Sequence, residues 1–87
     1  MNSIVVSYDP FAMESRVTVI HGDYNEQVSV ASNMESLVED LVALAYRYDT
    51  YSIKTHAPLA VTAEIKRQIT ALENNRYSEN KITVEGI

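Results

Sequence analysis

Residues 32–47, SNMESLVEDLVALAYR, decide the fold of this chain because they specify its most clearly patterned helix. Apolar side chains recur there at helical spacing and predict one buried stripe. The stripe consists of Met34, Leu37, Val38, Leu41, Leu44, Ala45 and Tyr48. Ser32 and Glu35 have the spacing of a capping box, in which the serine hydroxyl accepts a helix amide and the glutamate reaches back. The pattern predicts a helix that begins after Ser32 and runs to about Arg47.

Three β-strands are predicted before this helix, over residues 3–8, 16–21 and 27–31. These segments alternate in polarity or are rich in β-branched residues, as half-buried strands are. Asp9 and Pro10 end the first strand, because proline lacks an amide donor and marks a turn. Gly22 and Asp23 tolerate the backbone angles of a hairpin loop between the second and third strands. The first part of the chain is therefore expected to form an antiparallel meander.

The sequence after residue 47 predicts a strand over 51–56, a helix from about Pro58 to Asn74-Asn75, and a last strand over 81–85. Pro58 suits the first turn of a helix, where its missing amide costs little. Each helix is followed by a strand, which implies right-handed crossovers and parallel additions to one sheet. We therefore expect an α/β fold with two layers. Along the chain the elements follow the order βββαβαβ. The five strands are expected to form one mixed sheet, with two helices on one face and the other face open.

That order of elements resembles, over nearly the whole chain, the core of the ribonuclease H-like fold of ribonucleases H, resolvases, integrases and actin-like ATPases. The resemblance implies the sheet order 3-2-1-4-5, with the first strand central. The stretch from Ile4 to Pro10, IVVSYDP, is also similar to the opening of resolvases, in which Asp-Pro-Gly ends the first strand. The aspartate is a metal ligand in that family, and Asp9 matches it. Phe11 stands where the family has glycine.

The rest of the family's metal site does not carry over. Two divalent cations beside a scissile phosphate need several carboxylates. The fourth strand ends in Lys54-Thr55-His56 where the family has an acid, and no helix with a further acid follows the fifth strand. The weak catalytic candidates are therefore Asp9, His56 and Glu85, which make a poor magnesium site. We expect no metal and no cofactor, and a reduced metal-dependent nuclease or phosphodiesterase is only an alternative hypothesis.

Composition excludes several other functions. The chain of 87 residues has the length of a single domain, 1–87. It has no cysteine, which excludes disulfides and a nucleophilic thiol and favours a cytoplasmic location. Two glycines are too few for a phosphate loop or a dinucleotide fingerprint. The net charge of −5 disfavours nucleic acid as a partner, and the longest apolar run, Leu41 to Tyr46, is too short to cross a membrane.

A non-catalytic protein-interaction module that self-associates is the leading hypothesis. The open face of the sheet is expected to mix apolar and polar side chains, from Val5, Ser7, Thr18, Ile20, Ser29, Lys54 and Thr83. The third strand, QVSVA, is uncharged, rich in valine and placed at the sheet edge, where unpaired strands template association. The partner is expected to be a protein, including a second copy in a homodimer. The expected interaction residues are Val28, Ser29, Val30, Val5 and Ile20, with Ser29 facing away from the helices.

Two other features leave alternatives open. Residues 1–50 hold eight acids and two bases, a net charge of −6, so the chain could be a small acidic inhibitor of a nucleic-acid enzyme. Such proteins are frequent in phage and mobile elements. Tyr46, Tyr48 and Tyr51 gather around the end of the first helix. Tyrosine is enriched at protein interfaces, but it also packs at the rim of a small core.

Overall fold

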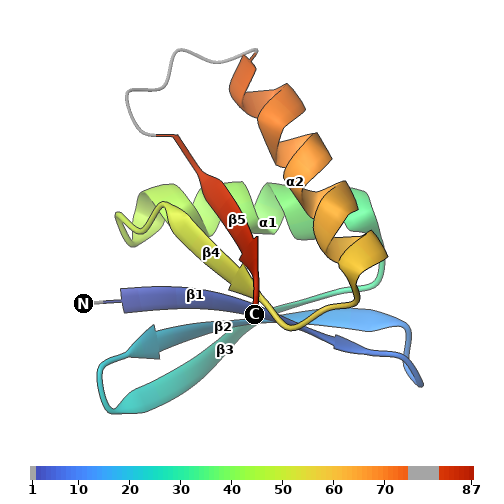
Figure 1. The fold of residues 1–87 in the computed structure, drawn as a ribbon. Coiled ribbons are helices and arrows are strands. Elements are labelled where there is room, and N and C mark those ends of the chain that lie inside the picture. The colour runs from blue at the N-terminus through green and yellow to red at the C-terminus, as the bar shows by residue number, and fades with distance from the viewer. Residues whose placement is uncertain (1, 75–80) are drawn as a thin grey trace.

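The computed structural model describes residues 2–74 and 81–87, and it has the α/β architecture that the sequence predicts (Figure 1). The elements are β1 (Asn2–Asp9), β2 (Glu14–His21), β3 (Tyr24–Ala31), α1 (Met34–Arg47), β4 (Ser52–Thr55), α2 (Leu59–Asn74) and β5 (Thr83–Gly86). They form one five-stranded mixed sheet in the order β3-β2-β1-β4-β5. β1 pairs antiparallel with β2 and parallel with β4, and β5 continues parallel to β4. This strand order is the one that the resemblance implies.

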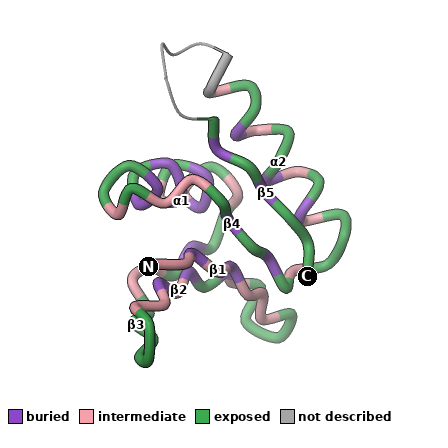
Figure 2. Tube along the Cα trace, turned by 60° about the vertical axis from the view of Figure 1, so that its left-hand side comes forward, coloured by how far each residue is buried: buried purple, intermediate pink, exposed green. Residues whose placement is uncertain are grey.

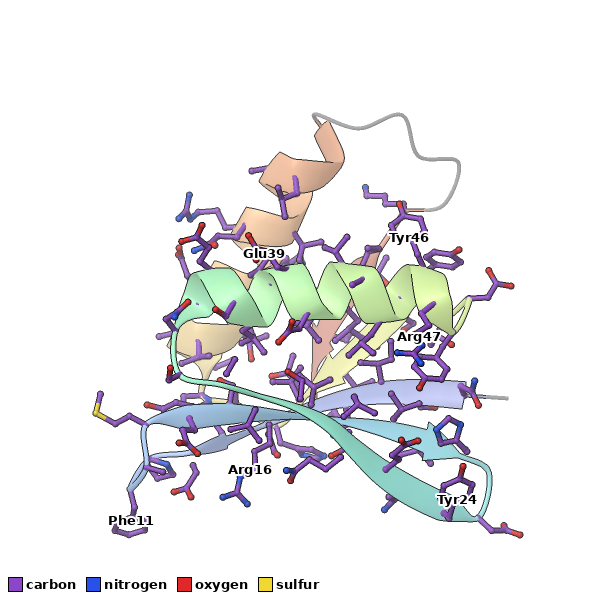
Figure 3. All side chains as sticks on the ribbon, turned by 180° about the vertical axis from the view of Figure 1, so that it is seen from behind. Phe11, Arg16, Tyr24, Glu39, Tyr46 and Arg47 are labelled. Carbon is purple, nitrogen blue, oxygen red and sulfur yellow. The ribbon has the colours of Figure 1, made fainter. Side chains whose placement is uncertain are left out.

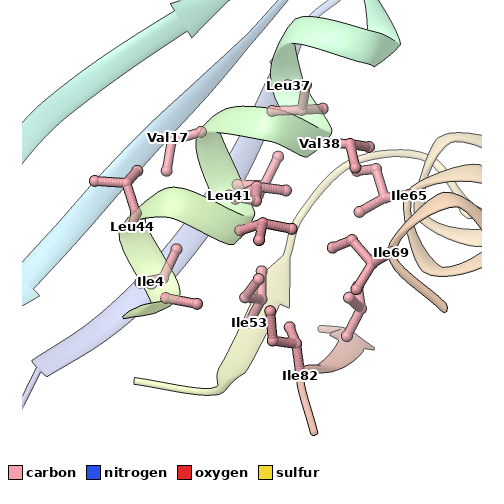
Figure 4. Packing of buried hydrophobic residues seen from close by; sticks show 14 of the residues in the cluster. Ile4, Val17, Leu37, Val38, Leu41, Leu44, Ile53, Ile65, Ile69 and Ile82 are labelled. Atoms are coloured by element: carbon pink, nitrogen blue, oxygen red, sulfur yellow. The ribbon is translucent and has the colours of Figure 1, made fainter. Parts of the chain in front are cut away.

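The hydrophobic core lies between the sheet and the two helices, which cover the same face (Figures 2 and 4). Along β1, Ile4 and Val6 are fully buried, whereas Val5 and Ser7 point to the open face and are half-buried. The buried side chains of the two helices meet above β1 and β4. The largest fully buried residues are Ile4, Leu37, Leu41, Ile53, Ile65 and Ile69. The core therefore forms one cluster that spans every element.

The crossover from β4 to α2 is held by a pair of buried threonines. Oγ1 of Thr55 lies 2.7 Å from Oγ1 of Thr62, and the amide of Ala57 donates to Thr55 Oγ1 at 3.0 Å. The hydroxyl of Thr62 also lies 3.3 Å from the carbonyl oxygen of Ala57. The hydroxyls of Thr55 and Thr62 therefore both have hydrogen-bond partners, as buried polar groups usually do. These hydrogen bonds fix where α2 begins relative to the end of β4.

Several boundaries differ from the sequence prediction, among them the start of β2 at Glu14 instead of Arg16 and of β5 at Thr83 instead of Lys81. Two further differences, at α1 and β3, have a clear physical cause. α1 is capped by Asn33 instead of Ser32, because Oδ1 of Asn33 accepts from the amide of Ser36 at 2.8 Å. β3 begins at Tyr24 instead of Gln27, since Gly22 adopts φ +66° and the two-residue turn lets His21 pair with Tyr24. A glycine at this turn position accepts positive φ without strain. The edge strand is consequently eight residues long.

A β-bulge in β3 overturns one predicted side-chain direction. Val17 pairs with Ser29 and Thr18 with Gln27, so Val28 is an extra residue on β3. Ser29 therefore lies opposite buried Val17 and faces the helix layer, where its hydroxyl donates to Oδ2 of Asp40 at 2.5 Å. The prediction that Ser29 faces away from the helices is wrong, because simple alternation does not allow for the extra residue.

Substitution of the central core residue Leu41 tests this packing. We expect Leu41→Ala to lower the free energy of unfolding by about 2–5 kcal/mol, because it leaves a cavity among fully buried neighbours. Urea denaturation followed by circular dichroism measures the change. Thr18→Ala, on the open face, is the control and should change stability far less. Equal losses in the two variants would contradict the assignment of the core to one face of the sheet.

Candidate interaction surfaces

Asp9, the residue that matches the resolvase aspartate, is occupied by its own turn. Its Oδ1 accepts hydrogen bonds from the amides of Phe11 at 3.0 Å and Ala12 at 3.3 Å. Its Oδ2 lies 3.7 Å from a guanidinium nitrogen of Arg16. Aspartate commonly closes turns in this way. The carboxylate of Asp9 thus organises the loop between β1 and β2.

His56 and Glu85 do not complete a site around Asp9. His56 is exposed after the last residue of β4, and Glu85 lies in β5 opposite Lys54, which pairs in turn with Val5. Asp9 lies four residues beyond Val5, a distance of about 13 Å along the strand. Among residues 2–74 and 81–87, no group of three or more histidines, cysteines, aspartates and glutamates is placed to hold a metal ion. The candidate catalytic residues therefore do not form a shared centre.

The predicted interaction residues divide between two faces of the sheet. Val5 and Ile20 are half-buried on the open face, in register with polar neighbours from adjacent strands. Val30 also lies on the open face, opposite Arg16, and is 48% exposed. Val28 and Ser29 lie instead on the helix side of β3. The edge strand therefore offers side chains to both faces.

A groove runs between the edge strand β3 and α1. It has a volume of about 220 Å³ and is lined by Val28, Ser29, Asp40, Ala43, Leu44 and Arg47. Ala43, which has a small side chain, is exposed. Asp40 and Arg47 lie on either side of Ala43 along the helix, with opposite charges. The groove and the unpaired edge of β3 form one continuous surface, which we call the β3 surface.

An aromatic cluster fixes one end of the β3 surface, and the sequence did not predict it. The ring of His21 stacks on Tyr24, with centroids 5.0 Å apart, and meets Tyr48 edge-on at 5.5 Å. Nε2 of His21 lies 3.3 Å from Oε2 of Glu26 without the alignment of a hydrogen bond. The guanidinium of Arg47 lies 5.7 Å from the ring centre of Tyr48. The tip of the β2–β3 hairpin is thus held against the end of α1.

Tyr46 and Tyr51 make a second aromatic contact beside this cluster. Their rings meet edge-on with centroids 5.5 Å apart. The chain reverses between them through Asp49 at φ +51°, which brings the amide of Thr50 to the carbonyl of Ala45 at 2.9 Å. The predicted grouping of tyrosines around the end of α1 is therefore confirmed, as packing within the molecule.

A hollow of about 550 Å³ lies beside β5. Ile69, Ile82 and Val84 line its base, and Lys66 and Lys81 stand at its rim. Both lysines are exposed, as are the other polar residues that line the hollow in the described part of the chain, Ser52, Thr70, Thr83 and Glu85. It is an open depression along the second sheet edge, without the convergent polar groups of a ligand site.

No protein-family model matches the chain, and no curated protein is significantly similar to it in sequence. No helix in the described ranges, 2–74 and 81–87, is long and apolar enough to cross a membrane. The function of the chain must therefore be inferred from its surfaces.

Asp9 is expected to contribute to stability through its turn. We expect Asp9→Ala to lower the free energy of unfolding by about 1–2 kcal/mol, because two backbone amides lose a charged acceptor. Asp9→Asn, which keeps a side-chain oxygen, should retain most of the stability. Thermal denaturation of the three proteins measures the difference, and equal stability of all three would refute the role of Asp9 in the turn.

Glu64 on α2 is expected to make stability depend on acid pH. Hydrogen bonds from Arg67 and Gln68 lower the pKa of the Glu64 carboxyl to about 2. A lowered folded-state pKa stabilises the fold above the ordinary value of 4.5, and the stabilisation is lost as the pH falls toward 2. Urea denaturation should therefore show wild type more stable than Glu64→Gln at neutral pH, with the difference vanishing below pH 2 and shrinking in high salt. A difference independent of pH would contradict the ionic origin.

Proposed function

We propose that this chain is a non-catalytic protein-interaction module that self-associates along the β3 surface. The observation that carries the proposal is the eight-residue edge strand, which within residues 2–74 and 81–87 pairs with β2 and with no second strand. Amide and carbonyl groups on the outer side of such a strand are free to pair with another strand. Two copies of β3 aligned antiparallel would join the two sheets into one.

The other edge of the sheet is less suited to pairing. β5 has four residues and carries Glu85. β3 has eight residues and also carries one acid, Glu26, whose carboxylate lies beside His21. The prediction of an uncharged edge strand is therefore wrong, because β3 begins at Tyr24, and the length of the strand is what distinguishes the two edges. Short edges and charged residues protect a strand against pairing. The difference between the edges favours β3 as the site of association.

The charges of the β3 surface are self-complementary. A dimer with a two-fold axis places the same surface of both copies in contact, so each charge must meet its opposite on the partner. Asp40 and Arg47 are separated by seven residues of helix, about 10.5 Å, with exposed Ala43 between them. When two β3 strands pair antiparallel, the two α1 helices also run antiparallel on one face. Arg47 of each copy then approaches Asp40 of the other.

The open face and the composition also support the proposal. Val5 and Ile20 place apolar area on a face that no helix covers, among serine and threonine side chains. Such a mixture is less polar than an ordinary solvent face. The cysteine-free sequence fits a reducing compartment, so the proposal includes a cytoplasmic location. A nuclease is not favoured, because Asp9, His56 and Glu85 lie apart.

Val30→Glu tests the β3 surface, with Thr83→Glu as a matched control. Both variants add one acid to the open face of an edge strand, and Val30 lies opposite Arg16, which would pair with the new acid within the fold. Sedimentation velocity at tens of micromolar should show association of the wild type, weakened at least tenfold by Val30→Glu and unchanged by Thr83→Glu. The proposal fails if the wild type is monomeric or if the two variants associate equally.

A further inference from the structure

The spacing of charges on the β3 surface restricts how two copies can align. The hydroxyl of Ser29 donates to Asp40, so these residues lie level with each other on β3 and α1. Arg47 lies about 10.5 Å further along α1, which equals about three residues of strand. Because β3 and α1 run in opposite directions, Arg47 lies toward the start of β3. Figure 3 accordingly shows Arg47 and Tyr24 at the same end of the molecule.

The two charges place the symmetry axis of a β3 dimer. A two-fold axis that brings Arg47 of each copy to Asp40 of the other must pass midway between these two positions. Since Asp40 is level with Ser29, the midpoint lies about 5 Å along β3 from Ser29 toward the start of the strand. The axis therefore crosses β3 at Gln27 or Val28.

The β-bulge distinguishes between these two positions. When two sheets join with both helix layers on the same face, residues opposite each other must point to the same face. Val28 is the extra residue, and without it side chains alternate between the two faces along β3. An axis through Val28 would place Gln27, on the open face, opposite Ser29, on the helix side. An axis through Gln27 gives matching faces on both sides of it.

We propose that two copies of this chain join in one register, with the two-fold axis at Gln27. This inference rests on the proposed self-association along the β3 surface and specifies its alignment. The charge spacing and the face of each side chain are separate observations, and both lead to the same axis. The pairs of opposite residues are Gln27 with Gln27, Glu26 with Ser29, Asn25 with Val30, and Tyr24 with Ala31.

This register gives the exposed ring of Tyr24 a contact. Tyr24 is 60% exposed at the start of β3, and its ring stacks on His21. Ala31, at the other end of β3, has a small side chain on the same face of the sheet. The ring of Tyr24 therefore comes beside Ala31 of the other copy. Because the stack on His21 already orders the ring, the contact loses little conformational entropy.

Glu26 is the charge that this register places unfavourably. It lies opposite Ser29 of the other copy, whose hydroxyl donates to Asp40, so two carboxylates approach each other. Like charges opposite each other destabilise a strand pair, so Glu26→Gln should strengthen association at least about threefold in sedimentation velocity. Glu35→Gln is the control, because it removes one acid from α1 outside the β3 surface. Equal association of the two variants would contradict the register.

Cross-linking tests the register directly, because the chain has no cysteine of its own. Gln27→Cys lies on the axis, so mild oxidation should join two copies by a disulfide. Asn25→Cys and Val30→Cys should not cross-link alone, because each lies about 13 Å along the strands from its counterpart, beyond the ~7 Å between Cα atoms that a disulfide spans. An equimolar mixture of these two variants should cross-link. All three positions are exposed, so the substitutions should leave the melting temperature of the reduced proteins unchanged.

Failure of the register and failure of the self-association give different results. The register is overturned if Asn25→Cys or Val30→Cys cross-links alone as readily as Gln27→Cys, because the strands then pair with a shift. The self-association along β3 still holds in that case if the wild type is a dimer that Val30→Glu weakens. A wild type that is monomeric at tens of micromolar overturns both.

Discussion

The pairing of β1 with strands on both sides holds the two parts of this fold together. β1 pairs along its whole length with β2, and residues Ile4 to Val6 pair with β4. The amide of His56 adds a bond to the carbonyl of Val6 at 2.8 Å, which extends the parallel pairing past the end of β4. Because β1 is central, its inward side chains must be apolar. Ile4 and Val6 are buried beneath the helix layer, whereas Val5 and Ser7 lie on the opposite face.

Periodicity predicted the parts of the fold that depend on one repeating pattern. The stripe of α1 and the right-handed crossovers predicted a two-layer mixed sheet. The strand order within the sheet was implied by the resemblance to the ribonuclease H-like fold and not by periodicity. The direction of Ser29 could not be predicted, since one extra residue at Val28 reverses alternation and leaves no mark in the composition. Asn33 caps α1 although Ser32 was predicted to do so. Both side chains suit a helix cap, so the sequence did not distinguish them, and the backbone conformation determines which residue occupies the cap position.

The candidate site was harder to predict than the fold, because it depends on contacts between distant segments. Asp9 matched a family motif in sequence, yet the adjacent amides of its own turn take up its carboxylate oxygen. His21 and Tyr48 lie 27 positions apart in the sequence and meet only once β2 and α1 are placed. The 99% exposure of Phe11 could not be predicted either, because it depends on the conformation of the turn between β1 and β2.

The distribution of charge bears on the proposed self-association. Glu35 and Glu39 are exposed on the outer side of α1, and neither forms an ion pair within the described residues. With a net charge of −5, two copies that approach through their helix layers repel each other. The β3 surface carries both signs of charge, from Asp40 and Arg47. The proposed self-association along the β3 surface therefore avoids this repulsion.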